Sequence, residues 1–318
     1  MPLKIATKII NENYRITQKD AEYLTLVSLD KLTSAADMLK KAHSKNNINL
    51  CSIINGKNGN CSENCKFCAQ SAHSKATDKA YGFLPVAEIV SDCIRHAQAG
   101  VHRYSIVTAG KALRGEDFEK ALKTYAQIHE KCPQIELCAS MGLIDREQLE
   151  RLKQVGVTRY HCNLETSEGN FENVCTTHSF GDKIDTLKNA QAADLEICSG
   201  GIIGMGESMR DRLDMAFSLR EIMANSIPIN ILKPIKNTPF ENVAPLNEEE
   251  ILRTIAIFRF INPNADIRIA AGRNYMKNNG LAAFISGADS TITGDFLTTT
   301  GSTIKTDIEM FKANSFTV

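Results

Sequence analysis

Short runs of β-branched and apolar residues recur along the chain, and longer stretches with a helical spacing of apolar residues separate them. Each short run is bounded by glycine, by proline or by residues that begin a helix, as buried strands are. The sequence predicts eight strands, at residues 48–54, 103–109, 135–140, 159–165, 196–203, 228–232, 266–271 and 290–294. The intervals between them are long enough for crossover connections, which favours parallel strands.

Amphipathic stretches fill most of these intervals, at residues 86–98, 116–130, 145–154, 182–193, 209–223 and 248–260. Asp145 is suited to begin a helix, and Gly100 and Gly156 are suited to end one. The repeated units predict an α/β fold, a (β/α)8 TIM-type barrel with an N-terminal helical extension at about 30–43 and a tail helix after residue 304. A doubly wound sheet is the alternative, but it does not explain why polar and thiol residues fall within so many strands.

No linker rich in proline, glycine and serine divides the 318 residues, and 43% of them are hydrophobic, enough for one large core. We therefore predict a single domain over residues 1–318. Its parts are an extension over about 1–46, the barrel over about 47–300 and a C-terminal tail over about 301–318.

The charge balance indicates a small-molecule partner. Thirty-seven Lys and Arg residues balance 37 Asp and Glu residues, so we expect no binding of nucleic acid or of an anionic membrane. The first residues form no apolar signal region, and no apolar run approaches the length that spans a bilayer. We predict a cytoplasmic protein whose ten cysteines serve metal or redox chemistry rather than disulfides.

Three cysteines, Cys61, Cys65 and Cys68, share one short segment with the spacing C-x3-C-x2-C. Three thiolates without a nearby fourth would leave one iron of a 4Fe-4S cluster free to bind another molecule. A structural zinc site and three unrelated buried thiols are the alternatives. Gly59 and Asn60 indicate an exposed loop, where unligated thiols would be reactive, so the cluster is favoured.

Polar and thiol residues within the predicted strands are further candidates, because barrels build their chemistry at the C-terminal ends of the strands. They are Ser105 on the second strand, Cys138 on the third, Cys162, Asn163 and Glu165 on the fourth, Cys198 on the fifth, Asn230 on the sixth and Arg268 on the seventh. Each taken singly also fits core filling, a loop cap or a buried ion pair. Cys51, Cys93 and Cys132 are interpreted as thiols that fill core or helix-face positions and do not bind metal.

From about residue 50 to residue 301 the sequence resembles the biotin synthase family of radical S-adenosylmethionine (SAM) enzymes. The resemblance rests on the cysteine triplet, NLETS (163–167), CTTH (175–178), CSGGIIGMGE (198–207), PIN (228–230), RIAAGR (268–273) and GDFLTTTG (294–301). The family inserts sulfur into dethiobiotin to form biotin. Its members pair as homodimers and take electrons from an external low-potential donor, which the resemblance therefore implies here.

The resemblance also assigns roles to individual residues. The triplet would hold the 4Fe-4S cluster that binds and cleaves SAM. The residues implied beside SAM are Phe67, Gly200, Ile202, Gly204 and Glu207, the last four in a G-x-I-x-G-x-x-E pattern. Asn163 and Glu165 would contact the SAM ribose and the dethiobiotin region, and Asn230 would line the substrate pocket.

The family holds an auxiliary 2Fe-2S cluster with three cysteines and one arginine, and this cluster is thought to give up a sulfide to the substrate radical. Cys138, Cys198 and Arg268 match three of these positions, but the fourth is Ser105. Serine is a poor ligand for iron–sulfur clusters, because its alkoxide forms much less readily than a thiolate. We predict an auxiliary cluster with altered ligation or nuclearity, with Cys162 and Cys175 as candidate replacement thiolates.

The role of Arg268 and the overall function each have alternatives. Arg268 is either a metal ligand or a neighbour that compensates charge, because guanidinium is normally protonated. The alternative functions are another radical SAM barrel enzyme, such as a maturase of FeFe-hydrogenase, and a non-catalytic iron–sulfur carrier.

Overall fold

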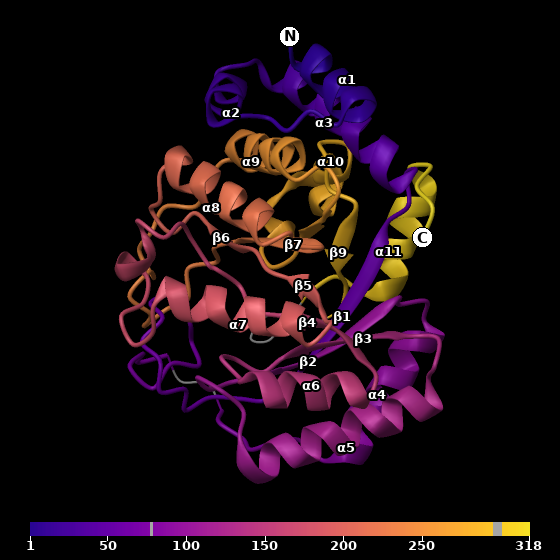
Figure 1. Ribbon diagram of the computed structural model, residues 1–318, viewed down its shortest axis with the longest axis vertical. Coiled ribbons are helices and arrows are strands. Elements are labelled where there is room, and N and C mark those ends of the chain that lie inside the picture. The colour runs from indigo at the N-terminus through magenta and orange to yellow at the C-terminus, as the bar shows by residue number, and fades with distance from the viewer. Residues whose placement is uncertain (77–78, 295–300) are drawn as a thin grey trace.

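The computed structural model describes residues 1–76, 79–294 and 301–318. Its strands form one closed parallel barrel, in the order β5-β4-β3-β2-β1-β9-β8-β7-β6, and the ring closes where β5 and β6 both pair with β7 (Figure 1). The strands are β1 (Asn49–Lys57), β2 (Arg103–Thr108), β3 (Glu136–Ser140), β4 (Val157–His161), β5 (Glu196–Cys198), β6 (Gly201–Ile203), β7 (Ser226–Ile231), β8 (Asp266–Ile269) and β9 (Ser290–Ile292). The predicted (β/α)8 barrel is confirmed, and the doubly wound alternative is wrong because the sheet has no open edges. Residues 295–300 of the GDFLTTTG motif lie outside the described part.

The fifth barrel strand, predicted as one run, is split into β5 and β6 at Ser199 and Gly200. A Cβ atom on Gly200 would lie 1.9 Å from the carbonyl oxygen of Pro228, and one on Gly201 would lie 2.5 Å from that of Glu165. Only glycine lets the neighbouring backbones approach this closely. The split therefore follows from tertiary packing.

The predicted fourth strand was too long. β4 ends at His161, so Cys162, Asn163 and Glu165 lie in the segment after the strand instead of within it. Glu165 has a φ of 72°, which no extended strand residue adopts. These side chains still lie at the C-terminal end of the barrel.

Helices surround the barrel in the order that the amphipathic stretches predict (Figure 1). They are α4 (Val86–Gln98), α5 (Gly115–Lys131), α6 (Arg146–Gln154), α7 (Phe180–Ala192), α8 (Met209–Glu221), α9 (Glu248–Ile261) and the short α10 (Leu281–Phe284). Asp145 caps α6 as expected, because its side chain accepts a hydrogen bond from the Gln148 amide. The 3-10 segments are Phe171–Asn173, Arg273–Tyr275 and Lys277–Gly280.

Three helices precede the barrel: α1 (Pro2–Glu12), α2 (Gln18–Thr25) and α3 (Leu29–Ser44). They pack together beside α9, as Figure 1 shows, and the tail helix α11 (Ile304–Ala313) lies near α3 and β1. Among the described helices, none combines the length and the apolar composition that crossing a bilayer requires.

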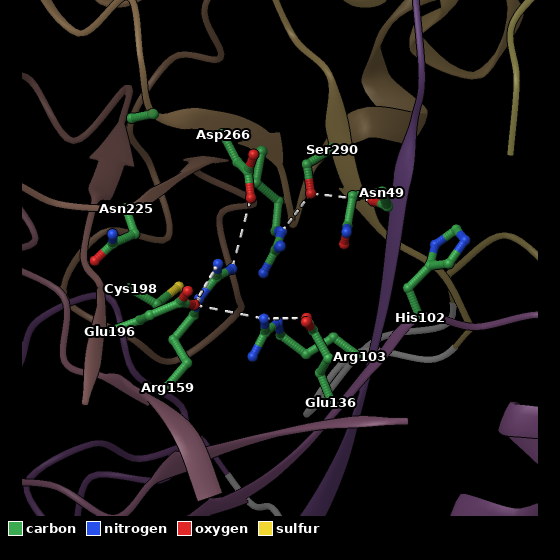
Figure 2. A network of polar contacts seen from close by, with 12 residues as sticks. Asn49, His102, Arg103, Glu136, Arg159, Glu196, Cys198, Asn225, Asp266 and Ser290 are labelled. Carbon is green, nitrogen blue, oxygen red and sulfur yellow. Dashed lines mark hydrogen bonds and ion pairs between the residues drawn. The ribbon is translucent and has the colours of Figure 1, made fainter. Parts of the chain in front are cut away.

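A layer of polar side chains fills the barrel near the N-terminal ends of the strands. We call the residues Arg103, Arg159, Ser226 and Ser290 the floor; all four are buried. Below them lies a carboxylate rim: Arg159 lies 2.7 Å from Glu196, and Arg103 pairs with Glu136 (Figure 2). The floor closes this end of the lumen and leaves the opposite end for chemistry.

Candidate active site

A pocket of about 260 Å³ lies inside the barrel and reaches the C-terminal ends of the strands. Nine of the residues selected from the sequence line it: Phe67, Cys68, Ser105, Cys138, Asn163, Cys198, Ile202, Asn230 and Arg268. Cys68 of the triplet lies at the same pocket, so the outer thiols and the inner thiols share one space.

The cysteine triplet lies on the loop after β1, held by backbone hydrogen bonds. The Cys61 amide donates to the Gln70 carbonyl at 3.0 Å, and the Ala72 amide donates to the Cys61 carbonyl at 2.8 Å. The Cys68 amide closes a turn onto the Cys65 carbonyl at 3.0 Å. All three thiols are partly exposed and free, so the loop presents three donors that can converge on one cluster.

A buried acid–imidazole pair supports this loop. The Nδ1 atom of His178 lies 2.6 Å from a carboxylate oxygen of Glu63. Burial alone would raise the pKa of Glu63, but hydrogen bonds from His178, Thr177 and Ser62 lower it below its usual value. Glu63 therefore carries a negative charge that ties the triplet loop to the segment after β4. Sequence reasoning did not select this pair, although His178 belongs to the CTTH motif.

Cys162 and Cys175, the candidate replacement thiolates, do not line the pocket. The Sγ atom of Cys175 lies 3.7 Å from that of Cys65, so Cys175 belongs with the outer triplet. Cys162 is buried among apolar core side chains. The structure brings neither of them to Cys138 and Cys198.

Two asparagines hold the broken fifth strand open beside the pocket. The Gly200 amide donates to the side-chain oxygen of Asn163 at 3.0 Å, and the Asn163 amide group lies 3.4 Å from Glu165. Asn230 donates to the Gly201 carbonyl at 3.2 Å and accepts from the Ala271 amide at 3.1 Å. Both side chains line the pocket while fixing its wall.

Glu207 acts on the backbone and does not line the pocket. Its carboxylate accepts from the amides of Gly204 at 2.8 Å and Met205 at 2.7 Å, and Arg212 lies 2.7 Å from it. Both charged side chains are only 2% exposed. The G-x-I-x-G-x-x-E pattern thus builds a rigid turn after β6.

An apolar wall lines one side of the mouth. Phe67 and Ile202 pack in a small cluster with Leu232, Met205 and Val174. An aromatic ring and aliphatic side chains offer the flat apolar contact that a purine base requires.

Strand register shows which inner side chains share one layer of the lumen. In TIM barrels, each layer takes four side chains from alternate strands. Cys138 on β3 is in register with Arg159 on β4, which is in register with Glu196 on β5. Cys198 lies two residues beyond Glu196 on β5, and this step relates each member of a layer to the next. The same step leads from Cys198 through Ser226 and Asp266 to Arg268.

One more step closes this layer. Arg268 on β8 is in register with Ser290 on β9, which is in register with Asn49 on β1. Cys51 lies two residues beyond Asn49. From Cys51, the pairing through Arg103 to Glu136 returns to Cys138. We call Cys51, Cys138, Cys198 and Arg268 the thiol layer. The same rule gives the next layer toward the mouth, which consists of Ser105, His161, Pro228 and Ile292. All eight side chains of the two layers line the pocket.

Sequence reasoning missed His161 and interpreted Cys51 as core filling. The Nδ1 atom of His161 lies 3.2 Å from the Sγ atom of Cys198. The period-two alternation of a strand would have placed His161 on the same face as Asn163. No pattern within one strand could have grouped Cys51 with the other inner thiols.

The thiol layer is suited to an anionic sulfur-rich group. Burial raises the pKa of the Cys198 thiol, but His161, Arg268 and Arg159 outweigh it and lower the pKa to about 6. Figure 2 shows Cys198 beside Arg159. Arg268 donates through Nε to Ser290 at 2.8 Å, while its buried Nη2 atom has no hydrogen-bond partner among the described residues. These residues fit an iron–sulfur cluster, because thiolates supply ligands and the cationic groups favour the charged form.

Comparison with known families and proteins agrees with this geometry. Residues 57–219 match the Radical SAM superfamily, and residues 228–317 match the Biotin and Thiamin Synthesis associated domain. The chain is 52% identical over 317 residues to a biotin synthase of Alkaliphilus metalliredigens, covering 99% of both chains. It is 51% identical over 315 residues to a biotin synthase of Clostridium beijerinckii, again covering 99% of both.

Solved structures share the fold at low sequence identity. Methylornithine synthase superposes with a TM-score of 0.86 at 18% identity, over 98% of this chain and 96% of that one. The FeFe-hydrogenase maturase HydG from Carboxydothermus hydrogenoformans superposes with a TM-score of 0.81 at 16% identity, over 99% of this chain and 78% of that one. At these identities the similarity establishes the barrel alone.

Proposed function

The chain belongs to the biotin synthase family of radical SAM enzymes, and from this premise we propose how its own residues serve biotin formation. It is a radical SAM enzyme of biotin synthesis that uses a 4Fe-4S cluster and SAM. The proposal rests on one observation: a single pocket joins the triplet loop at the mouth to the thiol layer inside the barrel.

The mouth of the pocket is the proposed SAM site. Cys61, Cys65 and Cys68 would hold the 4Fe-4S cluster, which with SAM supplies the radical that activates a C–H bond. Phe67 and Ile202 would receive the adenine on their apolar wall. Gly200 and Gly204, with Glu207 fixing the turn, would let the backbone lie close to the ligand.

The substrate is proposed to be dethiobiotin, bound between the mouth and the thiol layer. Asn163 and Asn230 line this part of the pocket, and Glu165 lies directly behind Asn163. Burial raises the pKa of Glu165, which favours a protonated carboxyl group beside the substrate. The closed floor and the barrel wall keep water from the reacting carbons, so the chain contributes positioning and exclusion of side reactions.

The setting of the reaction is also a proposal. We expect an external low-potential electron donor, a homodimer, a cytoplasmic location and a single functional unit over residues 1–318, as the resemblance implies. All ten cysteines are free, the state that a reducing compartment maintains.

One incubation tests the function. Anaerobically reconstituted protein, SAM, a low-potential reductant and dethiobiotin should yield biotin and 5′-deoxyadenosine. Formation of 5′-deoxyadenosine without biotin over a full time course would reject dethiobiotin as the substrate. Cluster binding without any SAM cleavage would instead indicate an iron–sulfur carrier.

A further inference from the structure

We propose that Cys51 supplies the third thiolate of the inner iron–sulfur site, together with Cys138, Cys198 and Arg268. Ser105, at the position where the family carries a cysteine, is then not a ligand. This inference rests on the proposed function, because it presumes that the thiol layer holds an auxiliary cluster.

The position of Cys51 in the barrel supports this assignment. Register places Cys51 on β1, Cys138 on β3, Cys198 on β5 and Arg268 on β8, which are alternate strands of the barrel. Each step crosses two strands in register and then moves two residues along the chain, and the last step returns to the residue from which the first began. The four side chains therefore point to one level of the lumen. Ser105 lies one layer nearer the mouth.

The Cys51 thiol is chemically suited to bind iron. Cys51 lines the pocket, is 3% exposed and is free, so its thiol is available to a group bound inside the barrel. Its Sγ atom makes one weak contact, at 3.8 Å to the Ser52 carbonyl oxygen. A thiolate is a far better ligand for iron than a serine alkoxide.

The surroundings of Cys51 differ from those of the core-filling thiols. Cys93 and Cys132 belong to the buried hydrophobic cluster, whereas Cys51, Cys138 and Cys198 are equally buried but lie outside that cluster. Cys51 instead faces the pocket that it shares with Arg268.

The arrangement has a consequence for the substrate side. With the ligands in one layer, Ser105 and His161 face the space between that layer and the mouth. The Nδ1 contact of His161 with Cys198 then makes His161 a positioning residue that orients a ligand from above. The inner site then takes all its ligands from one layer, whereas a site that used Ser105 would draw on two layers.

The test isolates the inner site in the full-length chain. In the background Cys61→Ala, Cys65→Ala, Cys68→Ala, bound iron and sulfide after anaerobic reconstitution report the inner site alone. Adding Cys51→Ser should lower retained iron about tenfold or more, as expected for loss of a ligand. Adding Ser105→Ala should leave iron and the Mössbauer spectrum unchanged. Cys93→Ser, a buried thiol outside the pocket, is the matched control.

A transposition completes the test. Cys51→Ser combined with Ser105→Cys moves the thiol from β1 to β2, to the family position, and should restore iron binding with a changed Mössbauer spectrum. Circular dichroism verifies that each variant is folded. If adding Cys51→Ser leaves the iron content and spectrum of the triplet-free background unchanged, the inference is overturned while the inner cluster stands. If the triplet-free background binds no iron at all, the inner cluster of the proposed function fails and the inference fails with it.

Discussion

The two thiol sites of this protein are built in opposite ways. The outer donors come from one continuous loop, residues 61–68, and remain partly exposed. The inner thiol layer takes its members from four strands and is almost wholly buried. A site on one loop is readable from sequence spacing, whereas a site built across strands becomes visible only when their register is known.

Their electrostatics differ as well. Burial raises the pKa of the outer Cys68 thiol to about 11, while His161 and two arginines lower the pKa of the inner Cys198 to about 6. The outer loop is shaped by backbone hydrogen bonds and the Glu63–His178 pair, whereas the inner layer is prepared by positive charge. The same ligand type is thus organised by geometry in one place and by charge in the other.

The largest expected effect comes from the outer loop. Cys65→Ala should abolish SAM cleavage and lower biotin formation by about a thousandfold or more, about 4 kcal/mol in the barrier, because no radical is generated. Release of 5′-deoxyadenosine measures it. Cys132→Ala, which removes a core thiol, should retain activity. Retained cleavage in Cys65→Ala would contradict the assignment of the outer site.

Removing the inner thiols should separate the two sites. Cys138→Ala combined with Cys198→Ala should abolish biotin formation but leave SAM cleavage within about threefold, because only the inner cluster is lost. Iron counts and Mössbauer spectra should show the outer cluster intact. The same iron content as the wild type would mean that no inner site exists.

Chelation should sharpen the contrast in burial. A chelator added to the reconstituted protein should remove outer iron about tenfold faster than inner iron, because the inner layer opens to solvent only through larger fluctuations. Absorbance and Mössbauer spectra of samples taken over time resolve the two phases. A single phase would show that the pocket exposes both sites equally.

The Glu63–His178 pair gives a smaller effect. His178→Phe removes one of the hydrogen bonds that the buried Glu63 carboxylate accepts, which costs about 1–3 kcal/mol. It should speed loss of the outer cluster while inner iron stays constant. The exposed Glu172→Gln, in the same connecting segment, is the control. Equal loss from both sites would indicate general unfolding instead.

Cys175 provides the smallest expected change. Although its Sγ atom lies 3.7 Å from that of Cys65, Cys175→Ala should keep the outer cluster and its spectral response to SAM, because three ligands suffice. Electron paramagnetic resonance with and without SAM measures this. A spectral response to SAM that appears only in Cys175→Ala would identify Cys175 as a fourth ligand of the outer cluster. It would contradict the prediction that one iron of this cluster lacks a protein ligand.

The sequence predicted much of the fold, because periodicity is local. The range 86–98 was predicted with the bounds that α4 has, and the order of strands and helices was correct. The end of β4 and the split at Gly200 were missed, since both depend on contacts with other strands. Local pattern cannot report a clash between backbones far apart in the chain.

The candidate site shows the same limit. The triplet was selected from the sequence by its spacing. Cys138, Cys198 and Arg268 were selected because thiol and charged residues are unusual within predicted strands. Cys51 was interpreted as core filling because cysteine is common in cores, and only the register of β1 against β9 and β2 places it in the pocket. Cys162 was selected by type, but the alternation after β4 turns it away from the pocket.

The floor determines from which end of the barrel iron and sulfide can reach the thiol layer. All four floor residues are buried, Arg103 and Arg159 are ion-paired, and Ser290 accepts a hydrogen bond from Arg268. Supply from below is therefore blocked along this part of the barrel. Iron and sulfide for the proposed inner cluster would then enter through the mouth, past the proposed sites of the outer 4Fe-4S cluster and SAM. Maturation would run from the inside outward, and a deep site emptied by turnover could be refilled only after the entrance is cleared.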